Sequence, residues 1–365
     1  MVQPPPRRPP ARPDGAAAHP PARRAALAVG AVALPWAVAG LARRARLVAA
    51  LPPDLRRASL LVPLGLPPTP FLPLARRLPV PDADVPPGVT VLRRTVPGDA
   101  GGPPVDVLVV EPTVRRPPAP ALLWIHGGGH VLGEAYADLA WCARLADELG
   151  VVVVAPDHRL APEHPYPAGH DDCRRVLRWL RAEADDLGVD PDRLAVGGAS
   201  AGGGVAASLA ATASDDGVPL RLQLLVYPML DDRTGLRLAG PRRLGWSHRS
   251  NRRGWAALLG RSPHDRRPAP APPRAAPARQ EDLTGLPPAW LGVGTLDVLH
   301  DETVEHARRL RSAGVAARLV VVPGVYHGTW GAAAGVPRVA ALQADAVARL
   351  AAALELGPAE GAPAR

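Results

Sequence analysis

The sequence predicts an α/β fold in which a mostly parallel central sheet carries helices on both faces. Two patterns support this class. From residue 89 onward, short apolar runs alternate with longer segments of helical periodicity. Most of these runs carry apolar residues on both faces, as expected for strands buried on both sides. The chain has 365 residues, 47% of them hydrophobic, which allows one large domain with a substantial core plus an appendage.

The expected elements follow in a regular order. The runs 90–96 and 105–111 are short and close together, so we expect a leading hairpin. The further strands are expected at 121–125, 151–157, 193–198, 220–229, 287–295 and 317–324. Apolar residues at helical spacing predict helices at 139–149, 168–184, after residue 200, at 301–313 and at 336–354.

The segments outside this rhythm define the expected domain organisation. Residues 1–44 form a Pro/Arg-rich extension, and residues 45–88 mix short apolar pieces with Pro and Arg. The regular domain is expected at 89–356, followed by a tail at 357–365. Within that domain, residues 231–285 are long, Arg/Pro-rich and weakly patterned. Insertions of this kind are often lids or pocket walls.

Residues 25–42 are uncharged and apolar, with arginine pairs on both sides. The segment fits a signal-peptide core, with Ala37-Val38-Ala39 as a cleavage-like site. It also fits a short membrane span or an Ala-rich helix on the domain surface. Membrane contact through residues 25–42, and the location of the protein, therefore stay open. The sequence does not predict an oligomeric state.

The net charge of +9 suggests nucleic-acid binding, but its distribution argues against it. Residues 1–60 contain ten arginines and only two acidic residues, whereas the rest of the chain is almost balanced. The chain has a single Phe and no basic stripe with interleaved aromatic residues. We therefore expect no nucleic-acid partner.

The glycine-rich stretch GGASAGGG, residues 197–204, lies between an apolar run and a helical segment. A phosphate-binding P-loop requires a lysine, and the chain contains none. The glycine spacing also fails the dinucleotide-binding fingerprint. The remaining match is G-x-S-x-G, from Gly198 to Gly202, a strand-to-helix turn that exposes a nucleophilic serine, here Ser200.

Three further features supply the partners that such a serine needs. His126-Gly127-Gly128-Gly129 follows a predicted buried strand, and its backbone N–H groups could stabilise an oxyanion. Asp297 and His327 each follow a later strand, where parallel sheets place functional groups. His327 can accept the serine proton and Asp297 can orient its imidazole.

A metal site is not expected. His126 and His130 have the i, i+4 spacing of a ligand pair, but three glycines separate them, so no helix holds them in register. The predicted serine chemistry also needs no organic cofactor.

The motifs IHGGGHVLG, APDHRLAPEHPYPA, VGGASAGG and PGVYHG, together with the segment EDLTGLPPAWLGVGTLDVLHDE, occur in this order between about residues 90 and 350. With them the chain resembles the hormone-sensitive-lipase-like esterases of the α/β-hydrolase fold. The resemblance implies a helical cap, for which residues 45–88 and parts of 231–285 are the candidates.

The resemblance also implies roles for individual residues. Ser200 would be the nucleophile, His327 the general base and then acid, and Asp297 the orienting carboxylate. The backbone N–H groups of Gly128, Gly129 and Ala201 would form the oxyanion hole. The supporting residues would be Gly127, which shapes the loop, His126, which orients it, and the elbow glycines Gly198 and Gly202.

The expected function is hydrolysis of short to medium acyl esters, small-molecule substrates, through an acyl-enzyme. The alternatives are an amidase, peptidase or lactone hydrolase on the same scaffold, and a non-catalytic binding protein. One departure from the family pattern concerns Ala199, because the residue before the nucleophile is often acidic in the family. The extension at 1–44 is a second departure.

Overall fold

The computed structural model describes residues 39–61, 65–67, 69–99, 102–115, 117–236, 244–265 and 269–356. The chain divides into two compact units, residues 1–61 and 62–365. In the first unit, a helix covers residues 39–49 and two 3₁₀ turns follow, η1 at Pro53–Leu55 and η2 at Ala58–Leu61. Most of the apolar segment 25–42 lies outside the described residues.

The second unit is built on an eight-stranded sheet with the order β1-β2-β4-β3-β5-β6-β7-β8. The strands are β1 (Val89–Val96), β2 (Val105–Pro112), β3 (Ala119–Ile125), β4 (Val152–Pro156), β5 (Val189–Ala199), β6 (Leu220–Val226), β7 (Ala289–Gly294) and β8 (Ala317–Val322). The expected hairpin of β1 and β2 is antiparallel, and β2 also pairs antiparallel with β4. From β4 to β8 every pairing is parallel, which confirms the predicted fold class.

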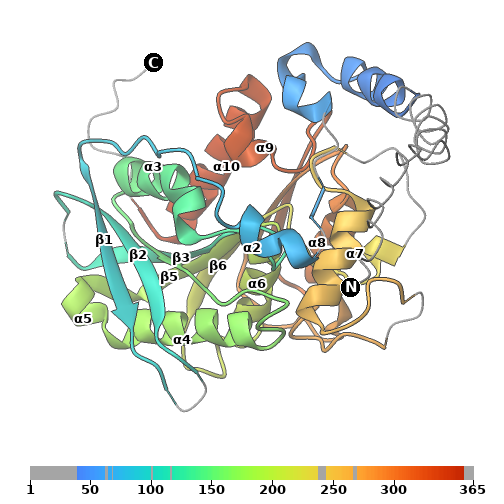
Figure 1. Ribbon diagram of the computed structural model, residues 1–365. Helices are drawn as coiled ribbons and strands as arrows, with labels where there is room; N and C mark the ends of the chain where they lie inside the picture. Colours follow the sequence, from blue (N-terminus) through green and yellow to red (C-terminus); the bar gives the residue numbers. More distant parts are fainter. Residues whose placement is uncertain are drawn as a thin grey trace, which may run out of the picture. The chain divides into compact units, whose positions relative to one another are not determined.

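Helices cover both faces of this sheet (Figure 1). One face packs against α3 (Leu139–Leu149) and α10 (Pro337–Ala353). The other packs against α4 (Ala168–Ala182), α5 (Ala184–Leu187), α6 (Ala201–Ala210) and α8 (His300–Ser312). Successive side chains of β3 alternate between the two layers: Leu123 and Ile125 join one core, and Trp124 joins the other. The strands β3 and β4 are apolar throughout because both of their faces are buried.

The structure differs from the sequence prediction mainly in the insert 231–285. That segment contains the eleven-residue helix α7 (His248–Leu258), which its polar, Arg-rich sequence did not indicate. Ser247 caps the helix by accepting a hydrogen bond from the Ser250 N–H at 3.0 Å. Burial of Trp255 and Leu258 then stabilises the helix against the rest of the fold.

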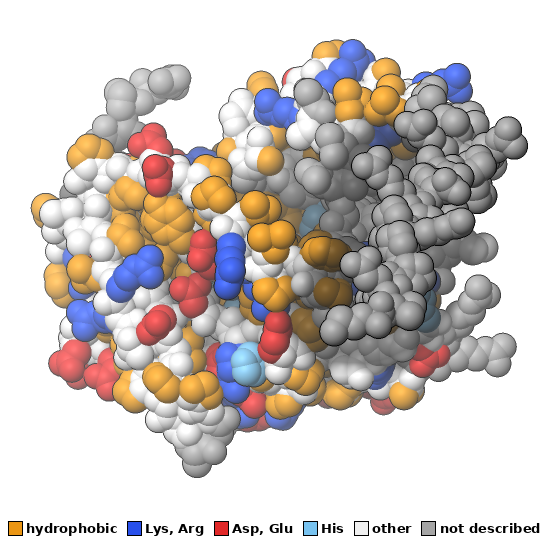
Figure 2. Space-filling model, viewed as in Figure 1, with side chains coloured by type: hydrophobic (Ala, Val, Ile, Leu, Met, Phe, Trp, Pro, Cys, Tyr) orange, Lys and Arg blue, Asp and Glu red, His pale blue; other side chains and the backbone are white. Residues whose placement is uncertain are grey.

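The remaining elements of the second unit are short. They are η3 (Thr69–Phe71), α2 (Leu72–Ala75), η4 (Ala135–Asp138), η5 (Thr234–Leu236), η6 (Pro277–Arg279) and α9 (Thr329–Ala332). Among the described residues, no helix combines the length and apolar character needed to cross a bilayer. On the described part of the surface in Figure 2, acidic and basic side chains lie interspersed.

Candidate active site

The turn between β5 and α6 places Ser200 in a strained backbone conformation, with φ 58° and ψ −118°. The glycines on either side make this turn sterically accessible. A Cβ atom on Gly198 would lie 2.5 Å from the Ile125 carbonyl oxygen, and one on Gly202 would lie 2.0 Å from the same atom. The strand-to-helix geometry expected of a nucleophile elbow is therefore present at the predicted position.

Ser200, His327 and Asp297 form one continuous hydrogen-bonded chain. The Ser200 Oγ lies 2.9 Å from His327 Nε2, and His327 Nδ1 lies 2.9 Å and 3.0 Å from the two Asp297 carboxylate oxygens. All three side chains are buried, and Asp297 is fully inaccessible to solvent. Residues separated by up to 127 positions in the sequence are thus brought together as predicted.

The sheet explains why these three residues meet. Ser200 follows β5, Asp297 follows β7 and His327 follows β8, so all three leave the sheet at the carboxyl ends of parallel strands. Asp297 is held further by the Leu299 N–H, which donates to its Oδ1 at 2.8 Å. One carboxylate therefore both anchors the loop before α8 and fixes the imidazole of His327.

The loop after β3 and the start of α6 contain backbone N–H groups without a protein acceptor among the described residues. Gly128 and Gly129 have φ values of 117° and 63°, which favour glycine. Within the described part of the chain, the N–H groups of Gly128, Gly129 and Ala201 donate to no protein acceptor. Ala201 is the first residue of α6, so the positive end of that helix dipole lies at the same place.

His126 supports the loop rather than reaching the serine. Its Nδ1–H donates to the Gly127 carbonyl at 2.8 Å, and its ring stacks on that of His158 with centroids 4.3 Å apart. Burial, together with the neighbouring His158, lowers the pKa of His126 to about 3. A neutral imidazole at this position keeps a positive charge out of the loop at physiological pH.

Two more histidines, His130 and His170, lie near this stack, with ring centroids 6.0 Å apart. Burial lowers their pKa values as well, that of His170 to about 3. Among the described residues, no group of three or more His, Cys, Asp or Glu side chains is arranged to hold a metal ion.

Two aromatic residues that the sequence did not single out contact the site. Tyr227 follows β6 and packs on His327 with ring centroids 4.6 Å apart. The ring centroids of Trp246 and His327 lie 6.1 Å apart. The Trp246 ring is also so close to Gly129 that a Cβ atom on Gly129 would lie 2.4 Å from the ring. The position of Tyr227 at the carboxyl end of a strand was a usable signal, whereas Trp246 lies in the weakly patterned insert.

Asp301 and Glu302, the first residues of the helix expected at 301–313, lie in the first turn of α8. Glu302 does more than complement the helix dipole. It is buried, and its carboxylate accepts hydrogen bonds from the N–H groups of Leu230 and Asp231 at 2.7 Å and 3.3 Å. It thereby ties α8 to the loop after β6.

A mostly parallel sheet with a Ser-His-Asp array at the carboxyl ends of its strands is the arrangement of the α/β hydrolases. The comparisons with known proteins agree. The model of a family described as having the alpha/beta hydrolase fold matches residues 122–331. The chain belongs to this family, the hormone-sensitive-lipase-like esterases.

Similar proteins include a carboxylesterase of Mycobacterium tuberculosis (NlhH), 36% identical over 272 residues, which are 70% of this chain and 80% of that protein. An ethyl acetate hydrolase of Pseudomonas putida is 37% identical over 212 residues, 57% of this chain and 65% of that protein. Among solved structures, a bacterial heroin esterase matches with a TM-score of 0.75 and 36% identity, over 84% of this chain and 99% of that one. The chain is accordingly a hydrolase of ester bonds.

Proposed function

We propose that this protein hydrolyses short to medium acyl esters by a serine mechanism in which Ser200, His327 and Asp297 form the catalytic triad. The observation that carries the proposal is the unbroken hydrogen-bonded chain from the Ser200 Oγ through the His327 ring to Asp297. The relatives are named for hydrolysis of carboxylic esters, ethyl acetate among them.

In the first half of the reaction, the Ser200 Oγ attacks the acyl carbonyl carbon while His327 Nε2 takes its proton. The imidazolium that forms is stabilised by the buried Asp297 carboxylate 2.9 Å from Nδ1. His327 then protonates the leaving alkoxide and an acyl-enzyme remains. In the second half, water attacks the acyl-enzyme, and the same imidazole takes and returns the proton.

We assign the oxyanion hole to the backbone N–H groups of Gly128, Gly129 and Ala201. Two observations support this assignment. None of the three N–H groups donates to a protein acceptor within the described residues. Ala201 directly follows Ser200, and a Cβ on Gly127, the residue before Gly128, would lie 3.4 Å from the Ser200 Cβ. Preorganised donors of this kind stabilise the tetrahedral intermediate by about 3 kcal/mol each.

We also propose that parts of the segments 45–88 and 231–285 act as the cap. Two contacts support this. Leu66 and Leu72 pack against Val131, directly after the oxyanion loop. The helix α7 approaches the same loop so closely that a Cβ on Gly254 would lie 2.7 Å from the Gly129 carbonyl oxygen.

The test is hydrolysis of p-nitrophenyl esters of increasing acyl length, with an aryl amide and a lactone as competing substrate classes. Ser200→Ala is expected to lower kcat/KM by at least about 10⁴-fold. A matched control is Ser208→Ala, a second buried serine, located within α6 and bonded to the Arg274 carbonyl. Full activity of Ser200→Ala, or amide turnover above ester turnover, would overturn the assignment.

A further inference from the structure

One side of α7 lines a groove of about 430 Å³ that contains none of the triad residues. The helix contributes Arg249, Arg252 and Arg253, together with Ala256 and Ala257. These positions follow the i, i+3, i+4, i+7, i+8 spacing of a single helix face. The groove therefore presents three arginines side by side on two turns of one helix.

The residues that line the groove outside α7 are largely apolar. They include Leu66, Leu72, Val131 and Pro162. Among the described residues that line the groove, none is acidic. A ligand in this groove would meet guanidinium groups from α7 and hydrocarbon from the segments around Leu66, Val131 and Pro162.

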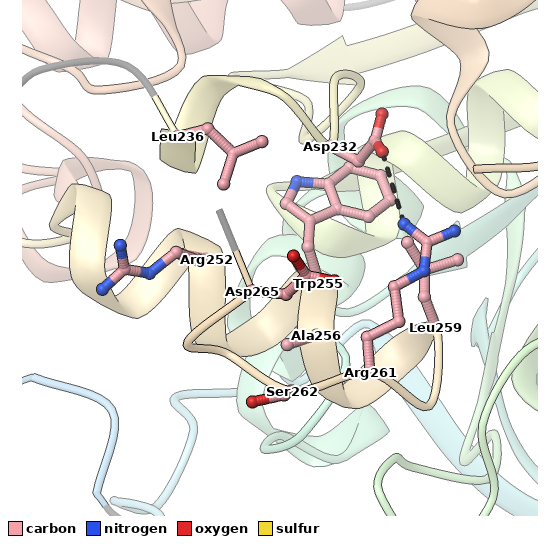
Figure 3. A pocket seen from close by; sticks show the side chains of 9 residues that line it. All are labelled: Asp232, Leu236, Arg252, Trp255, Ala256, Leu259, Arg261, Ser262 and Asp265. Atoms are coloured by element: carbon pink, nitrogen blue, oxygen red, sulfur yellow. Dashed lines mark ion pairs between the residues drawn. The ribbon is translucent and has the colours of Figure 1, made fainter. Parts of the chain in front are cut away.

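The three arginines of α7 differ from many other arginines among the described residues, which pair with carboxylates. Arg261, at one end of the groove, reaches Asp232 at 3.7 Å, and Arg279 holds the same carboxylate at 2.6 Å. Figure 3 shows Arg261 directed toward Asp232, whereas the side chain of Arg252 extends away from it. Within the described part of the chain, Arg249, Arg252 and Arg253 form no ion pair.

This arrangement is unfavourable without an anion. Like charges three and four residues apart on a helix destabilise it, and cations in its first turns oppose the helix dipole. The Nε atom of Arg252 is buried and has no hydrogen-bond partner among the residues that the structure describes. Burial and the charges of Arg249 and Arg252 lower the pKa of Arg253, whose guanidinium donates to the Leu66 carbonyl at 2.9 Å.

We propose that the groove is a binding site for a small amphiphilic anion, whose carboxylate or phosphate head contacts Arg249, Arg252 and Arg253 and whose apolar part lies against Leu66 and Val131. Planar guanidinium groups match the oxygens of carboxylates and phosphates. An anion there supplies the hydrogen-bond acceptor that the Arg252 Nε lacks. The site is separate from the triad and does not depend on the proposed reaction.

The test is calorimetric titration of the full chain after Ser200 has been blocked with a diethyl phosphoryl group, so that the reaction centre cannot bind the probe. The probes are octanoate, octan-1-ol with a similar tail and no charge, and inorganic phosphate with charge and no tail. Octanoate is expected to bind with one-to-one stoichiometry and at least ten times more tightly than either of the others.

Arginine pairs provide the matched variants. R252Q/R253Q is expected to weaken octanoate binding at least tenfold. R93Q/R94Q makes the same charge change at two exposed arginines of β1 and should leave the affinity within twofold of the parent. Arg249→Glu, at an exposed position of α7, is expected to weaken octanoate binding at least tenfold and guards against a folding defect in the double variant.

Three outcomes would overturn the proposal: equal octanoate affinity in the parent and R252Q/R253Q, equal affinity for octanoate and octan-1-ol, or binding to anionic vesicles without binding to dispersed octanoate. A failure of the phosphoryl group to attach to Ser200 would instead count against the proposed reaction. The octanoate titration would then be run on Ser200→Ala, so the two proposals fail separately.

Discussion

Gly129→Ala tests the proposed oxyanion loop where the loop packs against the side chain of Trp246. Gly129 has a φ of 63°, and a Cβ atom there would lie 2.4 Å from the Cη2 atom of Trp246. The new methyl group and the indole ring cannot both keep their positions. The backbone at Gly129, with the N–H that we propose as an oxyanion donor, must then shift, or Trp246 must move.

The expected size follows from two contributions. An alanine at this left-handed φ costs about 1–2 kcal/mol even without a clash. Displacing one oxyanion donor lowers kcat by about 10²–10³-fold. We therefore expect kcat/KM for p-nitrophenyl acetate to fall by about 10²–10³-fold in Gly129→Ala, with the protein still folded.

A second substitution separates the clash from the backbone strain. In G129A/W246A the overlap with the ring is removed, so kcat/KM should recover at least about tenfold relative to Gly129→Ala. Gly128 is the control, because its Cβ would lie 1.9 Å from the backbone oxygen of Leu132, which no side-chain truncation relieves. Trp246→Ala should therefore not rescue Gly128→Ala. Undiminished activity of Gly129→Ala, or equal rescue of both glycine variants, would refute this reasoning.

Three further predictions concern buried carboxylates. Asp297→Asn presents an amide to His327 and favours the wrong tautomer of the imidazole, so it should lower kcat/KM by about 10⁴-fold with little change in Tm. Asp301→Asn, which changes an exposed acid nearby, is the control. A loss below about tenfold for Asp297→Asn would contradict the proposed triad. Burial raises the pKa of Glu302 from its ordinary 4.5 to about 8, so the folded state binds the extra proton between these values. The free energy of unfolding should therefore fall as pH rises through that window, by about 5 kcal/mol at most. Urea titrations at pH 5 and pH 8 should show this fall in the parent and not in Glu302→Gln. The same change in stability with pH in parent and variant would argue against a role of Glu302 in this dependence. Ala199→Asp places a carboxylate in an apolar cluster, at a position that is only 6% exposed. It should lower the free energy of unfolding by roughly 2 kcal/mol or more. An unchanged urea midpoint would show that the site accommodates the charge.

The strands were predictable because burial of both strand faces requires apolar residues within one short run of the sequence. The run 121–125 is apolar at every position, and β3 is buried on both faces. The site was predictable for a related reason. Parallel strands end at one edge of the sheet, so residues following β5, β7 and β8 converge whatever their separation along the chain.

The start of β5 and the existence of α7 were not predictable in the same way. The strand begins at Val189 and runs through Asp190-Pro191-Asp192, whose residue types argue against a strand. The helix α7 has a polar surface and is stabilised by what covers its buried side. In both places tertiary packing overrides local preference.

The sequence by itself determined the sheet, the helices around it and the identity of the three residues proposed to carry the chemistry, because spacing and polarity pattern encode them locally. Only the tertiary structure decided how His126 stacks on His158, how Trp246 limits Gly129, and which arginines lack a carboxylate. Those contacts join side chains from distant segments, and their distances depend on how the insert 231–285 packs against the loops of the sheet.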